Sequence, residues 1–337
     1  MEGKKRSGKR IALTVLISIL AVVVFAVSFL FILRGAANIA RVDADAIPPS
    51  DNVHIVAESL ISAHRAGRRL APENTIAAFA RCFDLMEQEG YTIDNLEFDL
   101  QLTKDEHLVL LHDDTLDRTS NCEDLPAFGR RSRVADHTLA ELRTLEMWHD
   151  YDGTDFNPDE ARICTLEEVF DYIAGRGYTQ MRYTIEIKDS DERGQRATDK
   201  LYQILLSRGL LESTIVGTFN GDVTQYIDEK YCPLGMVRSA SIAEVVDLYF
   251  NFCFNVDLSN DLPAYRVLQI PTDDFVLFDF GKQSFIDYVH YYGIAVQFWT
   301  VNDQDKIESL MRMGADSIIT DYPDRANQAK QKIQKGE

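Results

Sequence analysis

The sequence predicts an α/β protein whose main part is a (β/α)8 barrel of the TIM type, preceded by one N-terminal transmembrane helix. Two observations predict the barrel. Short apolar runs of strand length alternate with helical patterns, which is typical of βαβ units and a parallel sheet. About eight such units fit into the roughly 280 residues after the N-terminal segment, and this suits a closed barrel better than an open sheet. A third observation, an uncharged apolar stretch near the N-terminus, predicts the transmembrane helix.

The alternation runs through most of the chain. The strand-like runs are Leu60–Ala63, Asn95–Leu100, Leu108–His112, Arg182–Lys188, Thr214–Phe219, Leu234–Arg238, Phe252–Asp257, Phe275–Phe278, Ile294–Thr300 and Ser317–Thr320. The helix-like runs are Thr75–Gln88, Thr165–Gly175, Gln195–Arg208, Gly221–Glu229, Ile242–Phe250, Ser284–Tyr292 and Asp303–Met313. The long, charged segment at about 120–160 interrupts the rhythm and contains one helical piece, Leu139–Leu145. We expect it to be an insertion on the active face of the barrel, where loops tolerate elaboration.

The composition is that of an acidic globular protein. The chain has 337 residues, of which 45% are hydrophobic and 26% charged, so disorder throughout is excluded. The 54 acidic and 35 basic residues give a net charge of −19, which argues against a nucleic-acid partner because such a surface would be basic. The five cysteines contain no C-x-x-C pair, which excludes a redox motif, a cysteine-rich zinc site and a dense disulfide scaffold.

The apolar stretch covers residues 11–33 and contains no charge. As a helix with a rise of about 1.5 Å per residue it reaches ~34 Å, enough to cross a hydrocarbon core. The tail before it, residues 1–10, contains five Lys and Arg residues, so the positive-inside rule places the N-terminus in the cytoplasm and the rest outside the cell membrane. A cleaved signal peptide is the rival, but its apolar core is usually only ~7–15 residues long. A buried core helix would show a polar face, and none is visible.

The rest of the chain divides into three expected parts. Residues 34–55, with Pro48 and Pro49, have the composition of a linker. Residues 56–326 form the outer domain, and residues 327–337 form a polar tail. Removing residues 1–41 takes away seven basic residues and one acidic residue. The remaining residues, 42–337, contain 28 basic and 53 acidic residues and have a net charge of −25. We therefore expect an anionic membrane surface to repel the outer domain.

Two strand-like runs carry charged residues on one face. Period-2 alternation puts Glu97 and Asp99 on one side of their run, and Glu186 and Lys188 on one side of another. A solvated acidic edge or a surface salt bridge would explain either run alone. A central parallel strand, however, has no solvated face. Two acids on a buried face repel each other unless a cation lies between them, and a third carboxylate completes an oxygen site for Ca²⁺ or Mg²⁺.

Two histidines follow apolar runs directly. His64 comes after Ile61-Ser62-Ala63, and His112 comes after Leu108-Val109-Leu110-Leu111. On a barrel this position is the catalytic face. A lone histidine there is more often structural, but two of them with Arg65, Lys188 and three acids favour a catalytic site. The set suits hydrolysis of a phosphodiester: cationic groups neutralise the anion, one histidine accepts a proton, and another protonates the leaving alkoxide.

At this point the chain resembles the glycerophosphodiester phosphodiesterase family, in a membrane-anchored bacterial form. The resemblance covers about residues 60–325 and rests on ordered motifs: His64-Arg65-Ala66-Gly67, Ala71-Pro72-Glu73-Asn74-Thr75, Glu97-x-Asp99, Thr103-Lys104-Asp105, His112-Asp113, Leu116-Asp117-Arg118-Thr119, Thr165-Leu166-Glu167-Glu168, Ile185-Glu186-Ile187-Lys188, Trp299-Thr300-Val301-Asn302, Gly314-Ala315-Asp316 and Ile319-Thr320-Asp321-Tyr322-Pro323. The family implies a TIM barrel, a divalent cation, and hydrolysis of glycerophosphodiesters to glycerol 3-phosphate and an alcohol.

The resemblance also implies a role for each matching residue. These roles are proton acceptor for His64, proton donor for His112, metal ligands for Glu97, Asp99 and Glu186, phosphate contacts for Arg65 and Lys188, and a pocket wall for Trp299. Glu73 and Asn74 either organise the site from behind or cap the helix after Pro72. The family motif usually reads His-Arg-Gly, and here Ala66 intervenes before Gly67, which predicts a different loop beside His64.

Several alternatives stay open on the sequence alone. The same residues suit a lysophospholipase D-like enzyme, since lysophospholipids contain the glycerophosphodiester unit, or an enzyme acting on a glycerophosphate polymer of a cell wall. A catalytically inactive, membrane-tethered binding barrel is the non-enzymatic alternative. The attacking group is either the neighbouring glycerol hydroxyl, which would give a cyclic intermediate and is our working hypothesis, or a water molecule.

Overall fold

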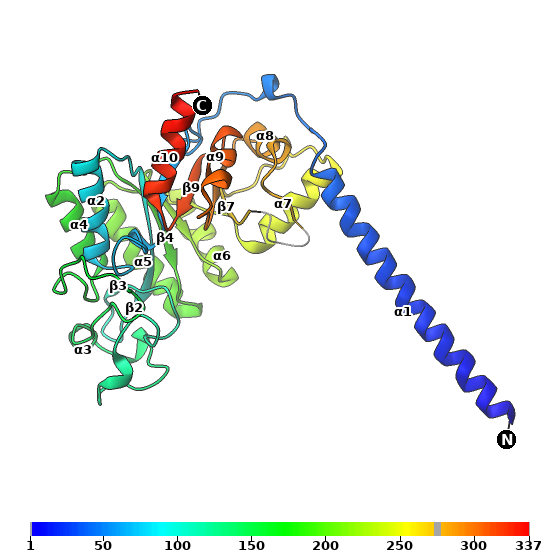
Figure 1. Ribbon diagram of the computed structural model, residues 1–337, viewed down its shortest axis with the longest axis horizontal. Coiled ribbons are helices and arrows are strands. Elements are labelled where there is room, and N and C mark those ends of the chain that lie inside the picture. Colours follow the sequence, from blue (N-terminus) through cyan, green and yellow to red (C-terminus); the bar gives the residue numbers. More distant parts are fainter. Residues whose placement is uncertain (1, 273–277, 337) are drawn as a thin grey trace.

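The computed structural model describes residues 2–272 and 278–336, and their centre is a parallel β-barrel (Figure 1). Its eight parallel strands are β1 (Leu60–Ala63), β2 (Asn95–Leu102), β4 (Arg182–Ile187), β5 (Thr214–Gly217), β6 (Val237–Arg238), β7 (Val267–Ile270), β8 (Ala295–Phe298) and β9 (Ser317–Thr320). They are ordered β6-β5-β4-β2-β1-β9-β8-β7. A parallel bridge between Ser239 and Val267 joins the two ends, so the barrel is nearly closed.

One helix follows each barrel strand in the described part of the chain, as the alternation predicts. In chain order these helices are α2 (Ile76–Glu89), α4 (Leu166–Gly175), α5 (Asp191–Arg208), α6 (Gly221–Lys230), α7 (Ile242–Phe254), α8 (Gln283–Tyr291), α9 (Gln304–Arg312) and α10 (Pro323–Gln334). They surround the sheet on its outside (Figure 1). The last of them, α10, continues past residue 326 and buries Asn327 and Ala329 against the barrel.

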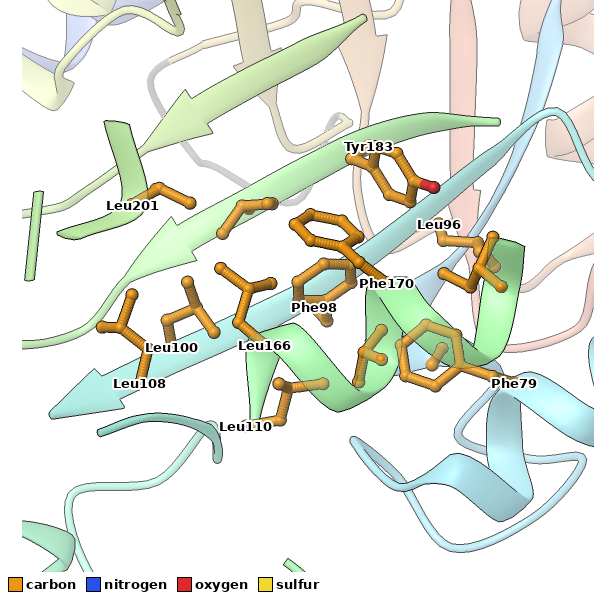
Figure 2. Close-up of a cluster of buried hydrophobic side chains, with 14 of the residues drawn as sticks. Phe79, Leu96, Phe98, Leu100, Leu108, Leu110, Leu166, Phe170, Tyr183 and Leu201 are labelled. Atoms are coloured by element: carbon orange, nitrogen blue, oxygen red, sulfur yellow. The ribbon is translucent and has the colours of Figure 1, made fainter. Parts of the chain in front are cut away.

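The main core lies between β2, β4 and the helices outside them. Leu96, Phe98 and Leu100 point outward from β2 and meet Phe79 of α2 and Phe170 of α4 (Figure 2). The alternate residues of β2, from Asn95 to Gln101, are therefore directed into the barrel. The predicted division of this strand into an apolar and an acidic face is confirmed, and the acidic face is the interior one.

The prediction of a strand at Phe252–Asp257 is wrong, because the C-terminal end of α7 occupies the start of this run. Ser241 and Glu244 form a capping box that starts α7, and the helix continues to Phe254. Its apolar residues are the buried side of a helix, because Leu248, Tyr249 and Phe252 all pack inward at helical spacing. The missing barrel strand is β7, which the sequence analysis did not identify. Of the run Phe275–Phe278, residues 275–277 lie outside the described residues, and Phe278 belongs to no strand.

The run Leu108–His112 forms a strand of a hairpin and not the expected strand of the barrel. Its strand, β3 (Leu108–Leu110), pairs antiparallel with the end of β2 and lies outside the barrel order. The connection from Leu102 to Leu108 is a tight turn, far too short for the crossover that a parallel pair needs. His112 is therefore brought to the active face by a hairpin and not by a barrel strand.

The insertion at about 120–160 follows this hairpin. It contains two 3-10 turns, Cys122–Asp124 and Val134–Asp136, and one short α-helix, α3 (Leu139–Leu142). This helix is capped by Thr138 and Glu141 and is shorter than the predicted Leu139–Leu145. Beneath it lies a small apolar cluster of its own, formed by Val109, Leu111, Leu116, Cys122, Val134, Leu142, Leu145, Met147 and Ile163. This cluster fixes the insertion to the hairpin rather than to the barrel.

The N-terminal segment forms one long helix, α1 (Glu2–Ala36), that projects from the barrel (Figure 1). Its part Thr14–Leu33 has a mean hydropathy of 3.1 and, apart from its C-terminal end, is not buried, so length and composition allow it to cross a membrane, as they would for a signal sequence. The end of α1 contacts the domain: Leu33 and Ala37 are buried in the cluster around α7 and α8. The following segment passes to the base of the barrel, where the Asn52 amide donates to the carbonyls of Arg266 and Gly293.

Replacing Phe98 with alanine tests the core that carries β2. Its ring is fully buried against Phe79, Phe170 and Tyr183, so the free energy of unfolding should fall by about 3–5 kcal/mol. Urea unfolding followed by circular dichroism measures this loss. Leu206→Ala is the matched control, because Leu206 is 50% exposed and should cost within about 0.5 kcal/mol. Equal losses would contradict the packing described.

Candidate active site

A cavity of about 350 Å³ opens at the carboxyl ends of the barrel strands. Its charged and polar wall comes from β1, β2, β4 and the hairpin, and contains His64, Arg65, Glu97, Asp99, His112, Thr184 and Glu186. The structure thus brings together both predicted histidines, all three predicted acids and Arg65. Trp299 also lines the cavity, and its ring lies 6.0 Å from that of Phe219.

The three carboxylates come from two adjacent strands. The register of β2 and β4 places Asp99 beside Glu186 and Glu97 beside Thr184. Burial, together with the neighbouring Asp99 carboxylate, raises the pKa of Glu97 well above its usual range, and the same two causes raise the pKa of Glu186. The barrel interior therefore holds these acids close together at an electrostatic cost.

Lys188 is the cation that the structure places among them. Its Nζ lies 2.8 Å from Glu186 Oε1 and 3.7 Å from Asp99 Oδ1. Burial acts to lower the pKa of Lys188, but the carboxylates of Asp99 and Glu186 outweigh it and raise the pKa. In this structure Lys188 stands beside the cavity wall as counter-ion of the acids, and its expected contact with a phosphate stays a prediction.

The donor chemistry of this cluster fits Ca²⁺ or Mg²⁺. All the donors are carboxylate oxygens, which these hard cations prefer. Asp99 Oδ1 is buried and has no hydrogen-bond partner, whereas Oδ2 accepts from Asn74 at 2.9 Å. Within the described ranges, no three His, Cys, Asp or Glu side chains already converge on a shared position for an ion. Glu97, Asp99 and Glu186 would thus hold a cation only with a rearrangement that includes Lys188.

His64 is held through one ring nitrogen. Its Nδ1 lies 2.6 Å from Asp321 Oδ1, and Asn302 donates to the other oxygen of that carboxylate. Burial acts to raise the pKa of Asp321, but the hydrogen bond and charge of His64, together with the hydrogen bond from Asn302, outweigh it and lower the pKa. A charged Asp321 assigns the proton to Nδ1 of the neutral ring. Nε2, which lies 4.0 Å from Glu97 Oε2, is then left as a proton acceptor.

His112 is held in the same way by a different element. Its Nδ1 lies 2.7 Å from Asp113 Oδ1, and Arg118 donates to both oxygens of Asp113. These two partners hold the pKa of Asp113 well below its usual range, although burial opposes them. Arg118 also binds Asp150 and Glu73. The guanidinium therefore fastens the insertion, the hairpin and the β1 loop together behind His112.

The loop after β1 has an unusual backbone. Arg65, Ala66 and Gly67 have φ values of 49°, 61° and 101° in succession. This left-handed run turns the Arg65 backbone N–H to Glu97 Oε2, 2.6 Å away. A Cβ on Gly67 would lie 2.9 Å from Cys82 Sγ, so glycine is needed at the third position for both its φ and its space. Ala66 is accommodated by adopting a left-handed conformation itself.

Glu73 and Asn74 support the site from behind. Glu73 is buried and binds the side chains of Arg65, Arg68 and Arg118, which lower its pKa against the effect of burial. Asn74 donates to Asp99. The cap residue of α2 is Thr75, so the alternative that Glu73 and Asn74 cap this helix is not what the structure shows.

The sequence analysis missed the partners of both histidines. Asp321 and Asn302 position His64, and Asp113 and Arg118 position His112. A signal for Asp321 was available, because it follows the strand run Ser317–Thr320 directly, just as His64 follows β1. The pairing itself depends on β9 lying next to β1 in the closed barrel, which no local pattern reveals.

Comparison with known proteins gives one consistent family. The model of the glycerophosphoryl diester phosphodiesterase family matches residues 64–325. A glycerophosphodiester phosphodiesterase of Caldanaerobacter subterraneus is 30% identical over 270 residues, which are 79% of this chain and 96% of that protein. A putative glycerophosphodiester phosphodiesterase of Bacillus subtilis is 32% identical over 266 residues, 78% of this chain and 95% of that protein.

Solved structures show the same fold. A putative glycerophosphoryl diester phosphodiesterase from Silicibacter pomeroyi superposes with a TM-score of 0.64 at 22% identity, covering 83% of this chain and 95% of that one. A phosphodiesterase from Oleispira antarctica, in complex with the product sn-glycerol-3-phosphate, gives a TM-score of 0.59 at 21% identity, covering 81% and 97%. At these identities the likeness concerns the fold.

The raised pKa values predict how stability depends on pH when no divalent cation is present. A carboxyl group whose pKa is raised in the folded state holds its proton more tightly there than in the unfolded chain. Its contribution to stability is present below the pKa of the unfolded state and is lost as the pH rises from that pKa through the pKa of the folded state. In EDTA, Glu97→Gln should therefore be about 1–2 kcal/mol more stable than the wild type at neutral pH. The advantage should vanish near pH ~4, where the unfolded carboxyl is itself protonated.

Urea unfolding at the two pH values measures this difference. Glu212→Gln is the control, because it removes the same charge from an exposed position and should leave the pH profile unchanged. A Glu97→Gln protein that is less stable than the wild type at neutral pH would refute the repulsion described.

Proposed function

The chain belongs to the glycerophosphoryl diester phosphodiesterase family, and from this premise we propose that it hydrolyses glycerophosphodiesters to glycerol 3-phosphate and an alcohol. His64 and His112 act as the proton-transfer pair, with a divalent cation, Ca²⁺ or Mg²⁺, bound at Glu97, Asp99 and Glu186. One observation carries this proposal. Two histidines, each held at Nδ1 by a carboxylate, line the same cavity as Glu97, Asp99 and Glu186.

The two histidines suit opposite proton transfers. The anionic Asp321 stabilises the positive charge that His64 gains when Nε2 accepts a proton from the attacking oxygen. Asp113 and Arg118 fix the orientation of His112, which donates a proton to the leaving alkoxide. This division gives the proton acceptor the more buried position, since the side chain of His64 is 12% exposed and that of His112 is 31% exposed.

The phosphate is recognised by positive charge at the same end of the cavity. Arg65 lines the cavity, and its buried Nε has no hydrogen-bond partner, so a movement of the side chain that exposes this nitrogen would let it bind a phosphate oxygen. A cation held by the three carboxylates would supply charge neutralisation at the phosphate. Lys188, which pairs with Glu186 and Asp99 in this structure, would then be a second positive group for the phosphate.

We place this reaction at the outer face of the cell membrane. The support is the apolar helix Thr14–Leu33 and the basic residues that precede it in the sequence. The end of α1 packs against the catalytic domain, so an uncleaved α1 would hold the active site close to the bilayer.

Release of glycerol 3-phosphate from glycerophosphocholine tests the proposal. The full chain in a nonionic detergent should release it with Ca²⁺ or Mg²⁺, lose the activity in EDTA, and regain it when the cation is added back. His64→Ala and His112→Ala should each lower kcat about 10²- to 10⁴-fold. The control is His107→Ala, whose side chain is 49% exposed and does not line the cavity, and it should keep the wild-type rate.

Three outcomes would contradict parts of the proposal. Full activity in EDTA would remove the cation from the mechanism. Undiminished activity of either histidine variant would remove that residue from proton transfer. Binding of glycerophosphocholine without turnover under either cation would favour the inactive binding barrel.

A further inference from the structure

The wall of the cavity opposite the carboxylates is apolar. It is formed at the start of α7 by Ile242, Val245 and Val246, at the end of β7 by Ile270, and before α8 by Phe278 and Phe280. A deacylated glycerophosphodiester carries hydroxyl groups, a phosphate and a polar alcohol. The three carbons of its glycerol are too few to cover a wall built from three segments, so such a substrate leaves most of this surface without an apolar partner.

This apolar wall reaches the surface of the molecule. Ile242 and Phe219 both line the cavity, yet they are 59% and 54% exposed. Large exposed apolar side chains at the edge of a cavity mark a route for an apolar ligand, because water contact with them is unfavourable. The wall therefore continues from the interior of the barrel to the mouth of the cavity.

The helix that supplies the wall also contacts the membrane-spanning candidate. The second half of α7 packs against the end of α1, where Leu33 and Ala37 are buried and Arg41 donates to the Cys253 carbonyl. In Figure 1, α7 lies between the barrel and this end of α1. Near the junction, Phe254 is 63% exposed and Ile39 is 52% exposed. The helix α7 thus connects the apolar side of the cavity with the edge of the domain to which α1, the candidate membrane helix, is attached.

We infer that the substrate is a glycerophosphodiester that retains one acyl chain, a lysophospholipid, with its phosphodiester between His64 and His112 and its chain along Val246 and the rest of the apolar wall. This inference rests on the proposed function and specifies the substrate class of the same site. The net charge of −25 on residues 42–337 favours a zwitterionic head group such as phosphocholine over an anionic one.

The reaction is an ordinary hydrolysis. One oxygen–phosphorus bond forms to the oxygen of water, the bond from phosphorus to the head-group oxygen breaks, and the departing alkoxide takes a proton. The products are an acylglycerol phosphate and the free alcohol, and no oxidant or further reactant is needed.

Choline release compares the two substrate classes with one readout. The full chain, in phosphatidylcholine vesicles with Ca²⁺ or Mg²⁺, is given glycerophosphocholine or the hexanoyl, octanoyl and decanoyl lysophosphatidylcholines below their micelle-forming concentrations. Each methylene that enters the wall should raise kcat/KM about fourfold. The decanoyl compound should therefore be preferred over glycerophosphocholine by well over tenfold.

A variant distinguishes binding of the acyl chain to the apolar wall from simple partition of the lipid into the vesicles. Val246→Asn places an amide on the wall and keeps α1, so partition is unchanged, and the ratio of kcat/KM for the decanoyl and deacylated substrates should fall about tenfold. Leu206→Asn, on the exposed side of α5, is the control and should keep the wild-type ratio.

The outcomes separate this inference from the proposed function. Choline release from glycerophosphocholine that equals or exceeds release from the acyl substrates overturns the inference and leaves the proposed function intact. An unchanged ratio in Val246→Asn overturns the assignment of the chain to this wall. No choline from any substrate under either cation contradicts both.

Discussion

The repulsion among three carboxylates inside the barrel is the interaction on which the rest of the site depends. Glu97 and Asp99 project from β2, and Glu186 projects from the adjacent β4 at the position beside Asp99. A (β/α)8 barrel ordinarily fills its interior with packed apolar side chains. Here it keeps three acids, and burial together with the neighbouring Asp99 carboxylate raises the pKa values of Glu97 and Glu186. The apolar cluster behind β2 and β4 holds the strands in register, so the acids cannot move apart without loss of core packing. These carboxylates therefore need a positive charge beside them. Lys188 provides it in this structure, and a divalent cation provides it in the proposed mechanism.

The two histidines proposed for proton transfer are held beside this charged centre by two independent supports. Asp321 comes from the end of β9, which neighbours β1 only because the barrel closes. Asp113 comes from the hairpin and is fixed by Arg118, whose other partners lie in the insertion and in the β1 loop. In the proposed mechanism the barrel itself thus holds the proton acceptor, and an added element holds the proton donor.

The sequence predicted most of the fold from local periodicity, and the resemblance to the family supplied the expected roles of the residues that the structure brings to the cavity. Alternation along Asn95–Leu100 identified the interior face of β2, and the strand-end rule found His64. The failures have physical reasons. The apolar run Phe252–Asp257 is the buried side of α7, and a short apolar run has no period that separates a strand from a helix. His112 reached the site by a hairpin whose direction depends on a turn. Contacts such as Lys188 with Asp99, or His64 with Asp321, require the register and closure of the barrel, which are long-range properties.

Isothermal titration of Ca²⁺ and Mg²⁺ into the cation-free full chain tests the central claim most directly. The account predicts one specific site per chain, with release of protons on binding, because Glu97 and Glu186 have raised pKa values when no cation is present. Titration in two buffers of different ionisation enthalpy detects those protons. Glu186→Gln should weaken binding about tenfold or more, and Glu212→Gln, at an exposed position, should bind as the wild type does. Equal binding by Glu186→Gln and the wild type, or no binding to the wild type, would contradict the claim that these three carboxylates form a cation site.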